Sequence, residues 1–308
     1  MINSERRFQK MTVTRRSHYV WRSYLEAWAT DGKIFCLRDG RIFNTNIINV
    51  AVERDFYRLH TLSDSDIQMI RAIFKNTYAP MQKIIDDFIF LFGWVGRLKE
   101  YLANDPEAAD CLDKHKITAE ENYHAQLEGK ITHIFQDIRG KDLNFYEDPC
   151  RCGQFTHFLC LQNLRTKGVR ERFLAAERAN PTAGFNAERS WNVIAHISAI
   201  NSGMSLMLNR KKRPLILLEN ETEIPFIVGD QPILNLFAPQ LGEPPTLLAF
   251  YYPVSPQLAV ILDEVEERTE FLPGPVSAAQ VNQLNRAIQR ASHKQLFANS
   301  SEALQPFV

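Results

Sequence analysis

The stretch Ser17-His18-Tyr19-Val20-Trp21-Arg22-Ser23-Tyr24-Leu25 places an imidazole, a guanidinium and three large aromatic rings within nine residues. Ser17 is a favourable helix cap, and Tyr24 and Trp28 continue an apolar face at helical spacing, so we expect a short helix here. That spacing does not account for His18, whose ring titrates near neutral pH. His18 is therefore the first candidate for chemistry, and its partners must come from elsewhere in the chain.

A β-hairpin is expected directly after this segment. Residues 33–37 and 41–44 are short runs rich in apolar residues, joined by Arg38-Asp39-Gly40. An Asp-Gly pair tolerates positive φ and is a strong hairpin signal. We therefore expect a helix, a hairpin and a polar connection over residues 17–62, preceded by a flexible N-terminus at residues 1–16.

The middle of the chain, residues 63–213, carries helical periodicity. Ser63-Asp64-Ser65-Asp66 precedes apolar residues at helical spacing, which is typical of a capped amphipathic helix. Asn104-Asp105-Pro106 marks a break between helices. We expect a loop at residues 150–153 and further helices from Pro80 and over residues 118–139, 155–174 and 191–208.

Short apolar runs replace this pattern after Arg213-Pro214. Pro, Gly and Asn separate them, as expected for strands of a mostly antiparallel sheet, and Ser277 then caps a closing helix. The sequence thus predicts one α+β domain over residues 1–308, with an N-terminal helix and β-hairpin, a large helical middle, and strands with a closing helix over residues 214–308. If the two β segments joined in one sheet, His18 would lie near Asp230.

Composition narrows the class of protein. The 308 residues carry 36 basic and 36 acidic side chains, so capture of nucleic acid by overall charge is excluded, while a local basic patch is not. Five cysteines form no secretory framework, and no apolar segment follows the polar N-terminus. The longest apolar run, residues 88–95, is too short to span a bilayer. We expect a cytoplasmic protein that does not enter membranes; its oligomeric state is left open.

Taken in order, several motifs resemble the uncharacterised domain-of-unknown-function family 4238 of bacterial and fungal proteins. The family's His-Tyr-Val-Pro-x-x-Tyr-Leu matches residues 18–25, with Trp21 in place of Pro. Its Gln-x-x-Arg-Thr matches residues 162–166, and its Ser-Asp-x-Pro matches residues 229–232 with Gly in place of Ser. Pro253-Val254-Ser255-Pro256 and a closing helix with Asn282 and Asn285 complete a resemblance that covers nearly the whole chain.

The resemblance carries no established chemistry. Members of that family look like accessory genes of mobile elements, including candidates for antiviral defence in bacteria. This association implies a toxic or nucleic-acid-directed effector, with nucleic acid or a phage component as the partner.

Six polar residues are the candidates for a site. His18 would act as general acid or base, and Asp230 with Glu128 as base or metal ligand; Arg165, Gln162 and Arg22 would bind substrate. Two carboxylates and a histidine could hold Mg²⁺ or Mn²⁺ for phosphodiester hydrolysis, although no compact nuclease motif is present. Three of these residues also have a structural interpretation: His18 as a core histidine or a helix cap, Asp230 in an Asx-turn, and Arg165 in an ion pair with Glu128 or Asp230.

A zinc site at Cys150, Cys152, His157 and Cys160 has suitable ligand types, but the spacing is not that of a standard site. Buried thiols beside an exposed loop are the favoured interpretation.

Three functional hypotheses follow. The chain is a nuclease that uses His18, Arg165 and Asp230, or a module that binds a small anionic ligand or a phage protein. In the third hypothesis, these motifs only hold the helices and the sheet together.

Overall fold

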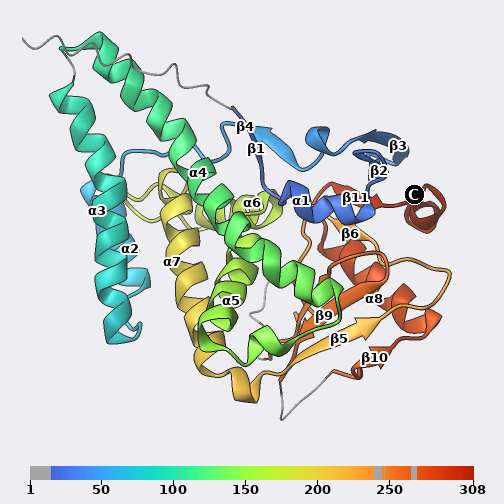
Figure 1. Cartoon of the computed structure of the whole chain (residues 1–308). Helices are drawn as coiled ribbons and strands as arrows, with labels where there is room; N and C mark the ends of the chain where they lie inside the picture. The colour runs from blue at the N-terminus through green and yellow to red at the C-terminus, as the bar shows by residue number, and fades with distance from the viewer. Residues whose placement is uncertain (1–14, 103, 239–244, 246, 265–268) are drawn as a thin grey trace, which may run out of the picture.

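A computed structural model describes residues 15–102, 104–238, 245, 247–264 and 269–308. The predicted flexible N-terminus falls almost entirely on residues 1–14, which lie outside these ranges. The chain has an α+β fold, in which a group of helices lies beside the strands (Figure 1). The predicted large helical middle and C-terminal strands are confirmed.

The helices are concentrated between residues 64 and 208. They are α1 (Arg22–Leu25), α2 (Asp64–Ile73), α3 (Ala79–Tyr101), α4 (Pro106–Arg139), α5 (Pro149–Leu164), α6 (Lys167–Ala179), α7 (Ala187–Leu208) and α8 (Ala278–Ala291). Short 3-10 turns are η1 (Glu26–Trp28), η2 (Ile47–Asn49), η3 (Asn144–Tyr146), η4 (Arg210–Lys212) and η5 (Glu302–Phe307).

Within the described residues, the strands form three sheets. A two-stranded sheet pairs β1 (Arg16–His18) with β4 (Val52–Arg54). A four-stranded sheet has the order β3 (Arg41–Asn46), β2 (Lys33–Arg38), β11 (Gln295–Ala298), β6 (Val228–Gly229). A five-stranded sheet has the order β10 (Gly274–Pro275), β5 (Leu215–Glu219), β9 (Leu258–Leu262), β8 (Phe250–Pro253), β7 (Leu234–Asn235), and only its β10–β5 pair is parallel.

The predicted hairpin is confirmed, and it joins C-terminal strands as the sequence suggested. Asp39 and Gly40 both adopt positive φ, at 52° and 70°, which the tight turn between β2 and β3 requires. The strand β11, which the sequence analysis missed, pairs with β2 on one side and β6 on the other. It therefore links the two ends of the chain in one sheet.

Three local predictions are wrong. Ser17 lies in β1, where it pairs with Glu53, and the helix begins only at Arg22. Residues 150–153 are not a loop, because Asp148 accepts a hydrogen bond from Arg151 N and caps α5 with Pro149 in its first turn. The helix expected over residues 155–174 is interrupted at Arg165-Thr166, where α5 ends and α6 begins.

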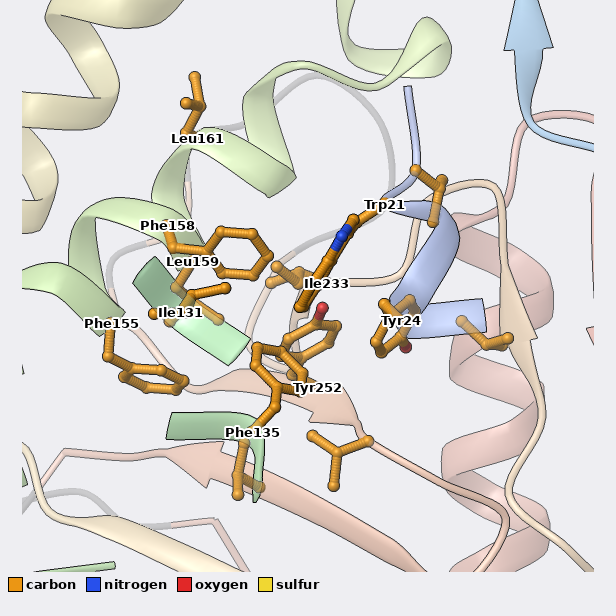
Figure 2. Packing of buried hydrophobic residues seen from close by; sticks show 14 of the residues in the cluster. Trp21, Tyr24, Ile131, Phe135, Phe155, Phe158, Leu159, Leu161, Ile233 and Tyr252 are labelled. Atoms are coloured by element: carbon orange, nitrogen blue, oxygen red, sulfur yellow. The ribbon is translucent and has the colours of Figure 1, made fainter. Parts of the chain in front are cut away.

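Aromatic rings from residues 17–25, the opening segment, lie in the main core (Figure 2). The Trp21 ring packs edge-on against Phe135 of α4 and Phe158 of α5, at centroid distances of 5.2 and 5.5 Å. Tyr24 stacks on Tyr252 of β8 at 4.9 Å. Ring pairs of this kind add to the free energy gained by burying the rings. Trp21 and Tyr24 therefore help to hold α4, α5 and β8 together.

Helices α5 and α7 approach closely at Gly203. A Cβ atom at this position would lie 2.8 Å from His157 Cα and 2.9 Å from His157 N. These are backbone atoms, so the helices themselves would have to move apart.

Gly203→Ala is therefore expected to lower the free energy of unfolding by about 1–3 kcal/mol, despite the better helix propensity of alanine. Gly129→Ala in α4 is the matched control, because a Cβ there meets nothing within 4 Å. That variant should gain up to about 1 kcal/mol. Urea unfolding of both variants tests the contact, and equal effects would contradict it.

Candidate functional site

The side chain of Gln162, at the end of α5, bridges two backbone groups of the opening segment. Its Nε2 donates to Tyr19 O at 3.0 Å, and its Oε1 accepts from Trp21 N at 3.2 Å. Gln162 is completely buried. Tyr19 O and Trp21 N lie between β1 and α1, and these bonds give both groups a hydrogen-bond partner.

Arg165, the residue that follows α5, donates hydrogen bonds to the Gln162 side chain. Its Nε and Nη2 donate to Gln162 Oε1 at 3.1 and 2.6 Å, and Nη2 also donates to Glu128 Oε1 at 2.7 Å. The Arg165 side chain is 3% exposed, so little of it is accessible to a substrate. Gln162, Arg165 and Glu128 thus meet, as the structural interpretation predicted.

Asp230 is held by the turn that precedes β11. Its Oδ1 accepts from His293 N at 2.7 Å, and its Oδ2 accepts from Lys294 N at 2.9 Å and Gln295 N at 3.2 Å. Burial raises the pKa of this carboxyl group, and the three amide donors oppose that rise. The bonds run across the sheet to residues 293–295, instead of closing the Asx-turn expected from the sequence.

Gln295, which the sequence analysis did not identify, connects this turn to the opening segment. Its Nε2 donates to Tyr19 Oη at 3.2 Å, and its Oε1 accepts from Ala51 N at 3.3 Å. A comparable link joins the other motifs, since Thr166 Oγ1 donates to Gln231 Oε1. The signal was the short run Gln295-Leu296-Phe297-Ala298 after the closing helix, which is the pattern of a buried strand.

His18, the last residue of β1, is partly buried, and Arg22 is the first residue of α1. Burial and the Arg22 cation lower the pKa of His18, whose Nε2 has no hydrogen-bond partner among the described residues. Arg22 is exposed. Within the described ranges, no hydrogen bond or ion pair joins His18 to Glu128 or Asp230, so the catalytic roles of these residues stay predictions.

The four residues weighed as a zinc site all lie in α5. Cys150 is exposed, whereas Cys152 and Cys160 are buried in α5. No three His, Cys, Asp or Glu side chains of the described residues are placed to hold a metal ion. The burial of the Cys152 and Cys160 thiols agrees with the interpretation favoured from the sequence.

A buried group of histidines lies between α4, α5 and α7. Glu120 Oε1 is 2.9 Å from His196 Nε2, and the rings of His196 and His124 stack at 5.5 Å. Burial and the neighbouring His196 lower the pKa of His157 to about 4, and burial with the nearby Arg165 lowers that of His124 well below its usual value. Burial raises the pKa of Glu120.

A surface groove of about 820 Å³ begins where Asn163 meets Gln231. Gln231 Nε2 donates to Asn163 Oδ1 at 2.7 Å, so this wall is built from residues inside two of the motifs. The groove runs along α8, and Arg172 of α6 closes one side. Apolar side chains make its floor: Ile233, Leu236, Phe237, Phe271, Leu284 and Ala287.

Two guanidinium groups line this groove without an acidic partner. The side chains of Arg172 and Arg290 form no ion pair or hydrogen bond with any of the described residues. Partial burial lowers the pKa of Arg172. Farther along α8, Gln283 Nε2 donates to Glu270 Oε1, which places one carboxylate in the groove as well.

The contacts of Gln162 predict a structural role. Gln162→Met keeps the size of the side chain but leaves Tyr19 O, Trp21 N and part of the Arg165 guanidinium without partners in a buried place. We expect a loss of at least about 3 kcal/mol in the free energy of unfolding. Gln154→Met on the outer part of α5 is the control and should cost under about 1 kcal/mol. Equal stability of the two variants would contradict the structural role.

The histidine group predicts sensitivity to acid. His157 binds fewer protons in the folded chain than in the unfolded chain, so stability falls as pH drops below about 6.5 and the loss is complete near pH 4. The effect amounts to at most roughly 3 kcal/mol. His157→Gln should flatten the curve of unfolding free energy against pH, whereas His133→Gln, at an exposed position of α4, should not. An unchanged curve in His157→Gln refutes this prediction.

Glu120 acts in the opposite sense, because its raised pKa makes the folded chain bind a proton more readily. The difference between the wild-type and His157→Gln curves therefore isolates the histidine.

Comparison with known proteins gives a family but no function. No curated protein and no solved structure matches this chain. None of the helices in the described ranges is long and apolar enough to cross a membrane. The family model described as a protein of unknown function (DUF4238) matches residues 16–302, from β1 into η5. The chain belongs to this family.

Proposed function

We propose that this protein is a binding module that captures a small anionic ligand in the groove along α8. The observation that carries the proposal is the pair Arg172 and Arg290, two cations that face one groove with no acidic partner among the described residues. A guanidinium presents several donors in a fixed plane, which suits a carboxylate, sulfonate or phosphate group.

The apolar floor adds a second requirement. Phe271 and Leu284 are buried below the groove, and Phe237 and Leu236 are partly buried at its edge. A ligand with only charged groups would leave the partly buried Leu236 and Phe237 in contact with water. The groove therefore suits an anion that also carries an apolar body, of a size that a groove of about 820 Å³ accommodates.

The motif residues support this groove from behind. Gln231 forms its wall, and the same side chain accepts from Thr166 and donates to Ile233 O at 3.1 Å. In this proposal Gln162, Arg165 and Asp230 shape the fold and do not contact the ligand. The nuclease and antiviral roles stay predictions, and the contacts of Arg165 and Asp230 give them no added support.

The fluorescent probe 8-anilinonaphthalene-1-sulfonate tests the proposal, because it combines a sulfonate with apolar rings. We expect one probe to bind the folded protein, and the double variant Arg172→Gln with Arg290→Gln to bind about tenfold more weakly, since charge-assisted hydrogen bonds are lost. Raising the salt concentration should weaken binding to the wild type more than to the double variant.

Arg286→Gln provides the matched control. Arg286 is an exposed arginine of the same helix and does not line the groove. Its replacement removes one positive charge and should leave binding within about twofold of the wild type. If Arg286→Gln weakens binding as much as the double variant does, the probe senses overall charge and the proposal fails.

A further inference from the structure

The groove is charged differently at its two ends. Gln283, Ala287 and Arg290 line it from one face of α8, because residues three or four apart lie above one another on a helix. Seven residues separate Gln283 from Arg290, which places them about 10 Å apart along the helix axis. Along α8, the groove therefore extends at least from Gln283 to Arg290.

The cationic end is the C-terminal end of α8. A Cβ atom at Gly168 would lie 3.0 Å from His293 Cβ and 3.4 Å from Arg172 Nη1, so Arg172 lies close to the residues that follow α8. Arg290 is in the last turn of the same helix. Both guanidinium groups therefore belong to one end of the groove.

The opposite end carries a carboxylate. Glu270 lies against Gln283, from which its Oε1 accepts a hydrogen bond, and the residue is exposed. No Lys, Arg or His of the described residues forms an ion pair with it. Between the two ends lie Leu284 and Ala287, which present no charge.

Resting on the proposed function, we infer that the ligand is a zwitterion: an anionic group at Arg172 and Arg290, an apolar body, and a cationic group at Glu270. A ligand with an anion alone would leave Glu270 unpaired and would place its other end near a negative charge. A free amino-carboxylate and the carboxyl end of a lysine-containing peptide share this chemistry.

Displacement of the bound 8-anilinonaphthalene-1-sulfonate probe measures whether the groove binds a zwitterion more tightly than a simple anion. Octanoate carries the anion and the apolar chain, and 8-aminooctanoate adds an ammonium group at a distance comparable to the length of the groove. An ammonium group normally weakens binding to an apolar surface, because it loses hydration. We expect 8-aminooctanoate nevertheless to bind the wild-type protein about two- to fivefold more tightly than octanoate, as an exposed ion pair allows.

Variants of Glu270 give the decisive comparison. Glu270→Gln should abolish the preference, and Glu270→Lys should reverse it so that octanoate binds more tightly. Glu223→Gln, which removes an exposed carboxylate outside the groove, should keep the preference. Persistence of the preference in Glu270→Lys, or its absence in the wild type, overturns the inference.

The source of the zwitterion is tested with the peptide acetyl-Lys-Ala-Leu, which has a free carboxylate and a lysine ammonium. Tighter binding of the peptide than of 8-aminooctanoate, with the same dependence on Glu270, assigns the groove to peptide ends; the reverse assigns it to small amino-carboxylates. Failure of the proposed function looks different, because the sulfonate probe itself would then bind without regard to Arg172 and Arg290.

Discussion

The fold depends on one buried amide, the side chain of Gln162. Backbone groups between β1 and α1 are buried without partners of their own, and leaving them unpaired would cost several kcal/mol. An amide satisfies both because it carries a donor and an acceptor on one plane. Arg165 fixes which way that plane faces, since its guanidinium attracts Gln162 Oε1 and leaves Nε2 toward Tyr19 O. The one-turn spacing of Gln162 and Arg165 is therefore a geometric requirement.

Buried side-chain hydrogen bonds also connect the helices to the sheets. Thr166 bonds Gln231, Asp230 bonds the turn at 293–295, and Gln295 returns to Tyr19, so polar contacts connect segments that are far apart in sequence. From the sequence alone, these polar residues cannot be told apart from a functional site. A functional site and a buried hydrogen-bond network both bring together polar residues that are far apart in sequence. Burial separates the two cases, and here it favours a network that specifies how helices and sheets meet.

Local signals made much of the fold predictable. Asp39-Gly40 defines the hairpin, and Ser63 and Ser277 cap their helices with capping boxes, since each signal involves neighbouring residues. Strand β1 was not predictable in this way: its partner β4 lies more than thirty residues away, and three residues show no clear period. The start of α5 could have been found, because Asp148-Pro149 is a recognisable beginning of a helix.

The groove could not have been found from spacing. Its walls come from the end of α5, from α6, from residues 231–238, from residues 269–271 and from α8, and these segments are far apart in the sequence. Arg172 and Arg290 look like ordinary surface arginines of amphipathic helices; what distinguishes them is a common groove and a missing partner, which are properties of the assembled fold. The groove also adjoins the motifs. Gln231, which accepts a hydrogen bond from Thr166 and donates one to Asn163, lines the groove together with Asn163. The buried network and the groove therefore share the Gln231 side chain, and a change in one is expected to alter the other.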